Sequence, residues 1–119
     1  MDVLVIEDDP DAREGLVRVF TRAGFAVTAV DDGLAALAQV RERAFDAIVL
    51  DLRLPYLPGG GFYEQLEHEA PALAQRVLFV TGIAHDPAVR EFLESTGRPY
   101  FAKPYDAKEL IDAVRSVAP

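Results

Sequence analysis

The stretch AIVLD, residues 47–51, has four apolar residues in succession and ends on an aspartate. VLVI at residues 3–6 and VLFV at residues 77–80 are built the same way, with no polar residue inside the run. A strand with one face in water alternates apolar and polar residues, whereas a parallel strand covered on both faces is apolar throughout. These three stretches therefore predict the buried strands of a parallel sheet.

Two further runs, FAVTAV at residues 25–30 and PYFA at residues 99–102, complete a set of five strands. From cap and stop residues, helices are expected from Asp9-Pro10 to Gly24, from Asp32, over residues 62–69, from Asp86-Pro87 to Gly97, and from Asp106 with Glu109. Strictly alternating strands and helices imply parallel strands joined by right-handed crossovers. The sequence thus predicts an α/β fold with a doubly wound five-stranded parallel sheet, forming one domain over residues 1–119. We assign it the order 2-1-3-4-5, one of the two common orders of such sheets, which the alternation itself does not select.

The composition is that of an ordinary globular chain, with half of its 119 residues apolar. No apolar run approaches the roughly 20 residues that span a bilayer, and the N-terminus lacks the basic leader of a signal peptide. The formal charge of −8 argues against binding of nucleic acid or anionic membranes by this domain. Because the chain has no cysteine, disulfides and thiolate zinc sites are excluded, and a cytoplasmic location is expected.

Polar residues directly follow four of the five predicted strands. Glu7 and Asp8 follow the first strand, Asp51 the third, Thr81 the fourth and Lys103 the fifth. In a doubly wound sheet, ligands bind beyond the carboxyl ends of the strands, at the switch in strand order. The first and third strands are neighbours in the predicted order, so Asp51 is expected beside Glu7 and Asp8.

Three carboxylates gathered at one edge would repel one another, by about 4 kcal/mol for two charges about 4 Å apart at an effective dielectric constant of about 20. A divalent cation removes this conflict, and oxygen ligands of this kind suit Mg²⁺. Lys103 adds a positive charge and Thr81 a hydroxyl, which are the groups that a phosphoryl group on Asp51 would need. Asp51 would then be the nucleophile that forms an aspartyl phosphate.

Each of these residues also has an ordinary interpretation when taken alone. Asp8 could be a surface acid, Thr81 a turn hydroxyl and Lys103 a solvated lysine. Their joint placement at the strand ends of one sheet favours a site. His68 and His85 do not form a metal-binding pattern.

The motifs VIEDD, VLDLRLP, VLFVTG and FAKP, in this order, resemble those of the receiver domain of two-component response regulators. The likeness covers essentially the whole chain and implies a flavodoxin-like (βα)5 fold. It also implies that Asp51 is phosphorylated by a phosphohistidine on a histidine kinase or histidine phosphotransfer protein. Mg²⁺ would be bound by Asp8, Asp51 and the backbone carbonyl of Arg53, with Glu7 acting through a bound water.

In the same family pattern, Lys103 would contact the phosphoryl oxygens and Thr81 would swing toward them. Tyr100 matches the family's aromatic switch, although an edge-strand aromatic packed on a helix is an equally good interpretation. Pro104 would follow a cis peptide bond. The output surface would comprise the helix from Asp86, the last strand and the last helix, and it would act on a downstream protein or a covalently attached output domain. A weak homodimer is also compatible with the resemblance. The chain would not be an enzyme beyond its own phosphoryl transfer and dephosphorylation.

Two other functions are compatible with parts of this pattern. A phosphatase of the haloacid dehalogenase type also uses aspartate, threonine, lysine and Mg²⁺, but it has Asp-x-Asp at its nucleophile, whereas Leu52 and Arg53 follow Asp51 here. A docking module with a receiver fold and no phosphorylation would usually have lost the acidic pair, the acceptor or the lysine. Whether the chain acts alone or belongs to a longer regulator or hybrid kinase stays open.

The segment YLPGGG, residues 56–61, departs from the family pattern. Pro58 stands where a helix cap is usual, and each of Gly60 and Gly61 costs about 1 kcal/mol of helix propensity relative to alanine. The third helix is therefore expected to begin late, near Phe62, after an unusual entry loop. Arg53 and Ile83 lie two residues beyond Asp51 and Thr81, and their bulk predicts a long-lived phosphoryl group.

Overall fold

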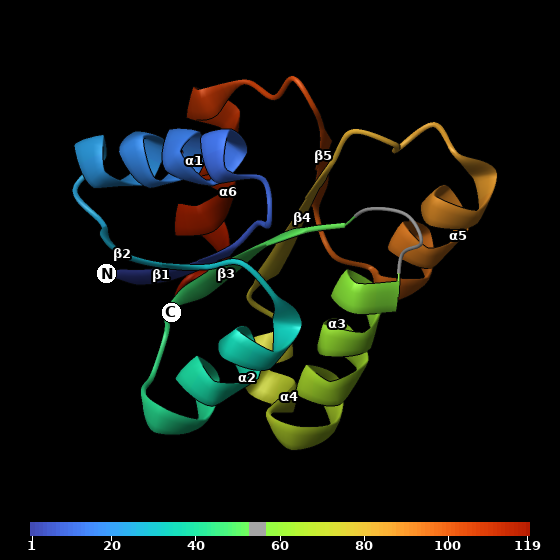
Figure 1. The fold of residues 1–119 in the computed structure, drawn as a ribbon, viewed down its shortest axis with the longest axis horizontal. Helices are drawn as coiled ribbons and strands as arrows, with labels where there is room; N and C mark the ends of the chain where they lie inside the picture. The colour runs from blue at the N-terminus through green and yellow to red at the C-terminus, as the bar shows by residue number, and fades with distance from the viewer. Residues whose placement is uncertain (53–56) are drawn as a thin grey trace.

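The computed structural model describes residues 1–52 and 57–119, with side chains for all of these except residues 57–60. Its five strands form one all-parallel sheet in the order β2-β1-β3-β4-β5, as predicted (Figure 1). The strands are β1 (Asp2–Ile6), β2 (Ala26–Val30), β3 (Ala47–Asp51), β4 (Val77–Thr81) and β5 (Tyr100–Ala102). The helices are α1 (Pro10–Arg22), α2 (Gly33–Glu42), α3 (Leu57–Glu69), α4 (Pro71–Ala74), α5 (Pro87–Thr96) and α6 (Ala107–Val117).

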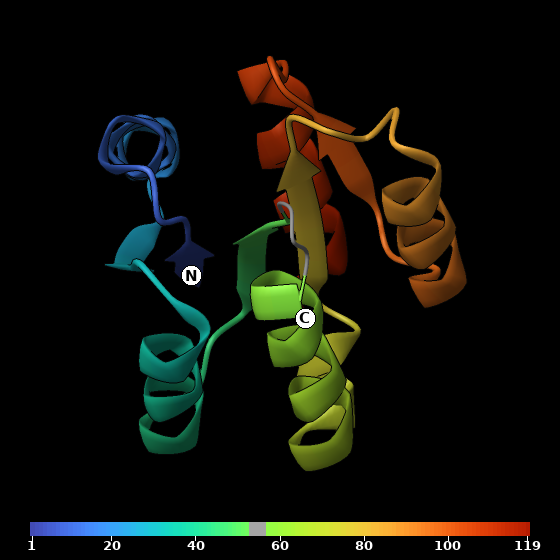
Figure 2. The same ribbon diagram turned by 45° about the vertical axis from the view of Figure 1, so that its right-hand side comes forward.

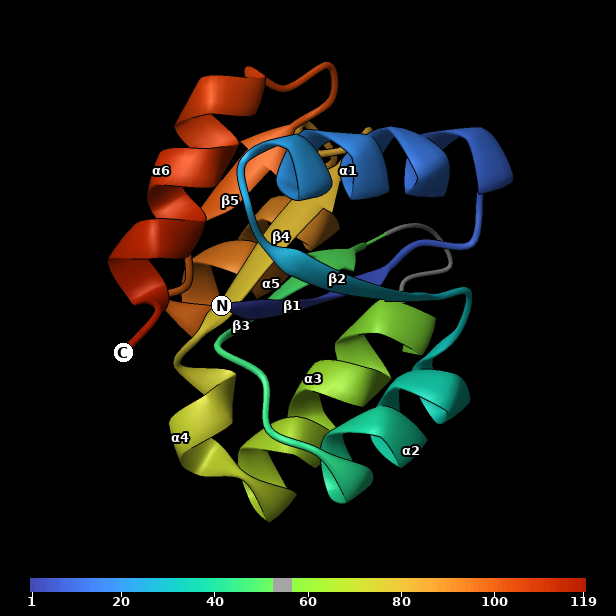
Figure 3. The same ribbon diagram turned by 90° about the vertical axis from the view of Figure 1, so that its left-hand side faces the viewer.

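Helices cover both faces of the sheet. In Figure 3, α1 and α6 lie above the sheet, and α2, α3 and α4 lie below it. Figure 2 shows β5 between α6 on one side and α5 on the other. No helix in the described part of the chain is long and apolar enough to cross a membrane.

Two hydrophobic cores explain why the central strands are apolar at every position. Leu4 and Ile6 of β1 belong to the core under α2, α3 and α5. Val3 and Val5 belong to the core under α1 and α6. Because successive side chains of a strand point to opposite faces, a strand that lines both cores has no position for a polar residue.

Four helices begin at an aspartate whose carboxylate accepts a backbone N–H of the first turn, as the sequence predicts. Asp9 accepts from Ala12, Asp32 from Ala35, Asp86 from Ala88 and Val89, and Asp106 from Glu109. At the other end of α5, Gly97 has φ 68°, the left-handed conformation that terminates helices. These caps fix the starts of the helices that follow β1, β2, β4 and β5.

The predicted start of the third helix near Phe62 is wrong, because α3 begins at Leu57 and includes Gly60 and Gly61. Pro58 lies in its first turn. Backbone N–H groups in that turn have no partner within the helix, so the N–H that proline lacks costs no helical hydrogen bond. The buried side chains of Phe62, Tyr63 and Leu66 hold the helix on the sheet. Burial of such a side chain contributes roughly 1.5–3 kcal/mol, which exceeds the cost of about 1 kcal/mol for each glycine. The predicted entry loop is wrong over residues 57–61, which belong to α3, and its first residue, Tyr56, lies outside the described residues. The short helix α4 was not predicted.

Candidate functional site

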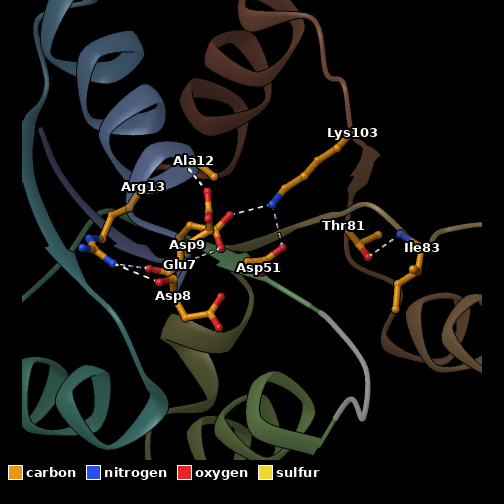
Figure 4. A network of polar contacts seen from close by, with 9 residues as sticks. All are labelled: Glu7, Asp8, Asp9, Ala12, Arg13, Asp51, Thr81, Ile83 and Lys103. Carbon is orange, nitrogen blue, oxygen red and sulfur yellow. Dashed lines mark hydrogen bonds and ion pairs between the residues drawn. The ribbon is translucent and has the colours of Figure 1, made fainter.

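The register of the sheet places the predicted site residues at one edge. Ile6 of β1 pairs with Leu50 of β3, so the next residues, Glu7 and Asp51, stand side by side. Thr81 is the last residue of β4 and pairs with Ala102 of β5, which directly precedes Lys103. Figure 4 shows these side chains gathered beyond the strand ends. The strand order therefore brings together residues that lie far apart in the sequence.

Three carboxylates form a cluster at this edge. Glu7, Asp8 and Asp51 each offer an oxygen, and these oxygens lie within 4.8 Å of one another. Glu7 and Asp51 are buried, whereas Asp8 is exposed, so the cluster is open to solvent on the side of Asp8. Hard oxygen donors with one open side suit Mg²⁺, which retains several of its waters. The donor set thus fits the predicted ion.

Lys103 supplies the counter-charge inside the cluster. Its Nζ lies 2.6 Å from Glu7 Oε1 and 3.1 Å from Asp51 Oδ1 (Figure 4). The backbone N–H of Lys103 donates to the Thr81 carbonyl at 2.8 Å, which ties the lysine to the end of β4. The Lys103–Pro104 peptide bond is cis, as the resemblance implied.

The buried cluster changes the acidity of its members. Burial raises the pKa of Asp51 to about 6, and the negative charge of Glu7 adds to this effect while the Lys103 ammonium opposes it. Burial acts on Glu7 in the same direction, but its hydrogen bonds with Lys103 and Asp51 outweigh burial and lower the pKa of Glu7. Burial opposes the charge of Lys103, yet its contacts with the two carboxylates raise its pKa. Glu7 and Lys103 therefore form a charged pair beside an aspartate that is a weaker acid than usual.

Thr81 is fully buried at the end of β4, and its Oγ1 accepts a hydrogen bond from the Ile83 N–H at 3.1 Å. In Figure 4 this hydroxyl faces Ile83 and not Asp51. Tyr100 lies on β5 opposite Phe79 and is 37% exposed. Any coupling between Tyr100 and Thr81 stays a prediction, and the predicted Arg53 carbonyl ligand lies outside the described residues.

One residue near the site was missed in the sequence. Arg13 of α1 reaches back to the acidic turn, where its Nη1 donates to the carbonyl oxygens of Glu7 and Asp8. No sequence motif marks such a contact, because its acceptors are backbone carbonyls that any residue carries.

Known proteins share this architecture. Residues 3–115 match the family described as the response regulator receiver domain. The chain is 35% identical over 117 residues to the sensory transduction protein RegX3 of Mycobacterium tuberculosis, covering 97% of this chain and 49% of the relative. It is 34% identical over 119 residues to the transcriptional activator protein IrlR of Burkholderia pseudomallei, covering 98% and 50%.

Among solved structures, the receiver domain of the Francisella response regulator 1452 superposes with a TM-score of 0.82 at 27% identity, covering 98% of this chain and 94% of that one. This chain spans about half the length of the curated relatives named above. The family match covers residues 3–115, a range that includes the acidic, threonine and lysine positions at the strand ends. The chain therefore belongs to the response regulator receiver domain family.

Proposed function

We propose that this receiver domain, which spans residues 1–119, is a phosphorylation-activated switch with Asp51 as its phosphoacceptor. The observation that carries the proposal is the position of the Asp51 carboxylate, which is buried at the strand ends between a lysine and two further acids. An acceptor needs one reachable oxygen, a fixed cation and a site shielded from bulk water. The groups around Asp51 meet these needs.

In the proposed reaction, one carboxylate oxygen of Asp51 attacks the phosphorus of a phosphohistidine on a partner protein. The new O–P bond forms as the P–N bond breaks, and the imidazole nitrogen keeps the electron pair and takes up a proton. Lys103 lies 3.1 Å from Asp51 and is placed to balance the charge that collects on the phosphoryl oxygens. Deprotonated Asp51 is the reactive form, because the charged carboxylate is a much stronger nucleophile than the neutral acid.

Asp8, Asp51 and the Arg53 carbonyl would hold Mg²⁺ directly, with Glu7 contributing through a bound water. When bound, this ion neutralises negative charge on the carboxylates and the phosphoryl group. The close approach of three carboxylate oxygens supports this assignment, because a divalent cation would remove the repulsion between them.

The switch would operate through Thr81. Its hydroxyl now accepts a hydrogen bond from the Ile83 N–H, and a phosphoryl group on Asp51 offers it acceptor oxygens instead. A turn of this side chain would release Ile83 and shift the loop that leads into α5. The expected output surface is formed by α5, β5 and α6, with Tyr100 of β5 as the coupled aromatic.

The partners follow from the family. The domain would act in the cytoplasm, with a histidine kinase or histidine phosphotransfer protein as the phosphodonor. The output would act on a downstream protein or an attached domain. Because the chain spans only half of its curated relatives, an attached output domain is the arrangement that we favour.

Arg53 and Ile83, which flank the approach of water in this proposal, would slow hydrolysis of the phosphoryl group.

The proposal is tested by incubating the protein with Mg²⁺ and a small phosphodonor such as acetyl phosphate, and separating phosphorylated chains on a phosphate-affinity gel. Asp51→Asn should abolish labelling because the amide cannot act as the nucleophile. Asp31→Asn, which changes an exposed acid outside the cluster, should label like the wild type. Label that persists in Asp51→Asn would rule out Asp51 as the acceptor, and an unlabelled wild type would point to a docking module.

A further inference from the structure

Among the side chains that the structure describes, the Tyr63 hydroxyl is the one buried polar group without a hydrogen-bond partner. Tyr63 lies in α3 and is 2% exposed, so bulk water does not reach the hydroxyl. Burial, and next the negative charge of Glu67, raise the pKa of Tyr63. The Glu67 carboxylate is therefore near, but it does not meet the hydroxyl in hydrogen-bonding geometry. An unpaired buried hydroxyl is unfavourable, and it calls for a position of the protein in which it is paired.

Two phenylalanines hold the Tyr63 ring where it is. The centroid of the Tyr63 ring lies 5.3 Å from that of Phe79 of β4 and 6.4 Å from that of Phe92 of α5, both edge to face. Phe79 and Phe92 also contact each other, at 5.8 Å between centroids. The three rings join α3, β4 and α5, so Phe92 is a contact through which α5 restrains Tyr63.

The helix that carries Phe92 is also the helix that the proposed switch moves. The Ile83 N–H donates to Thr81 Oγ1, and the Ile83 carbonyl accepts from the N–H of Asp86, which caps α5. A turn of Thr81 toward a phosphoryl group therefore frees Ile83 and with it the start of α5. Any displacement of α5 changes the contact between its aromatic ring and Tyr63.

We propose that Tyr63 biases the switch toward activation, because its ring turns when α5 moves and its hydroxyl then donates to the Glu67 carboxylate. Glu67 is exposed and lies four residues further along α3, a spacing at which side chains of one helix meet. The hydroxyl is then unpaired only while Phe92 holds the ring, so it destabilises the position of α5 seen here. This inference rests on the proposed function, since it requires that phosphorylation of Asp51 displaces α5.

Removal of the hydroxyl should make the switch harder to trigger. An unpaired buried hydroxyl raises the free energy of a state by an amount that corresponds to about a 5–150-fold change in an equilibrium constant. Pairing with Glu67 recovers only part of this, because an exposed carboxylate gives up hydration when it accepts the bond. Tyr63→Phe keeps the ring and its edge-to-face contacts, and we expect it to shift the equilibrium about three- to tenfold toward the position of α5 seen here.

The test is the affinity for beryllofluoride in the presence of Mg²⁺, with beryllofluoride as a mimic of the phosphoryl group on Asp51. Titration is followed through the amide NMR signals of α5. Tyr63→Phe should bind the mimic about three- to tenfold more weakly than the wild type, because binding must draw on a less populated position of α5. A hydroxyl that is equally unpaired in both positions would strain the fold without changing this affinity.

The acceptor is tested by removing it. Glu67→Ala should weaken binding of the mimic by a factor similar to that of Tyr63→Phe. Glu64→Ala is the matched control, since it removes the same charge from another exposed position of α3, and it should stay within about twofold of the wild type. Because Tyr63 and Glu67 act through one bond, the double variant should bind no more weakly than Tyr63→Phe alone.

A second readout needs no mimic. Amide hydrogen exchange in α5 of the unphosphorylated protein should be about three- to tenfold slower in Tyr63→Phe than in the wild type, because α5 leaves its position less often. Unchanged affinity for the mimic in either Tyr63→Phe or Glu67→Ala would overturn the proposal, and so would unchanged exchange in α5. Absence of mimic binding by the wild type would instead contradict the proposed phosphoacceptor site, and exchange in α5 would then decide the role of Tyr63.

Discussion

Asp51 combines two properties that oppose each other. Its burial and the neighbouring Glu7 favour the protonated form and raise its pKa to about 6, whereas attack on phosphorus needs the carboxylate. Lys103 limits the conflict by contacting both acids. Without a divalent cation the site is therefore under electrostatic strain, and this strain has a measurable effect on folding.

We expect Asp51→Asn to stabilise the metal-free protein at neutral pH by about 1–3 kcal/mol, since a shift of one pKa unit corresponds to about 1.4 kcal/mol. Folded Asp51 binds its proton more tightly than the unfolded chain does. Stability of the wild type therefore falls as pH rises from the ordinary pKa of 3.8 to about 6, and it stays low above that. The asparagine variant lacks this loss.

Denaturant unfolding in the presence of a chelator, repeated from acid to slightly alkaline pH, measures the difference. The gain of Asp51→Asn over the wild type should shrink as pH falls below about 6. Asp31→Asn should show no comparable trend. A gain that is independent of pH, or a loss at neutral pH, would contradict the raised pKa.

Single residues of the site could be predicted where strand ends mark them. Glu7, Asp51, Thr81 and Lys103 each follow or end an apolar strand, so the strand order alone places them together. Arg13 could not be predicted in this way, because its contact joins a helix side chain to the carbonyls of a turn. The direction of the Thr81 hydroxyl depends on the Ile83 N–H and is likewise a property of the folded loop.

At the scale of elements, helix starts were predictable wherever a polar cap stands before the helix, as Asp32 does for α2 and Asp106 for α6. The start of α3 was not predictable in this way. The low helix propensity of Gly60 and Gly61 can be read from the sequence, whereas the burial of Tyr63 that stabilises the helix depends on the folded structure. Propensity at the start of a helix is thus a weaker guide than the apolar residues that follow it.

The pairing of α2 with α3 supplies a further test. Arg41 of α2 makes a two-point ion pair with Glu69 of α3, at 2.9 and 2.6 Å, and Gln65 donates to the same carboxylate. The hydrogen bonds from Arg41, followed by that from Gln65, lower the pKa of Glu69 to about 2. Two helices that follow different strands are thereby joined near their C-terminal ends.

Arg41→Met should return the titration of Glu69 toward the ordinary value of 4.5, because the guanidinium is the main group that stabilises its charged form. Carboxyl carbon NMR measures this midpoint directly. Because the pKa of Glu69 is lower in the folded state, the ion pair stabilises the fold at pH values above the pKa of the unfolded chain. This contribution is lost as pH falls from 4.5 toward 2. Arg43→Met removes a guanidinium that pairs with Asp2 instead, and it should leave Glu69 unchanged. If the titration midpoint of Glu69 is the same in Arg41→Met as in the wild type, the ion pair does not persist in solution.

For the whole molecule, the decisive property is that five parallel strands point their carboxyl ends to one edge. Two cores, one on each face, hold the strands in place and thereby fix where the site residues leave the sheet. The alternation of apolar runs and helical patterns made this arrangement predictable. The chain spans about half the length of its curated relatives, so the process that the domain controls is not predicted from this sequence.

Chemical identification of the phosphorylated residue tests the central claim most directly. Borohydride reduces an acyl phosphate on aspartate to homoserine, which marks the position permanently. After treatment with acetyl phosphate and Mg²⁺, peptide mass spectrometry should find homoserine at position 51 and at no other aspartate. Homoserine at another position, or none in a protein that binds Mg²⁺, would contradict the assignment of Asp51 as the phosphoacceptor.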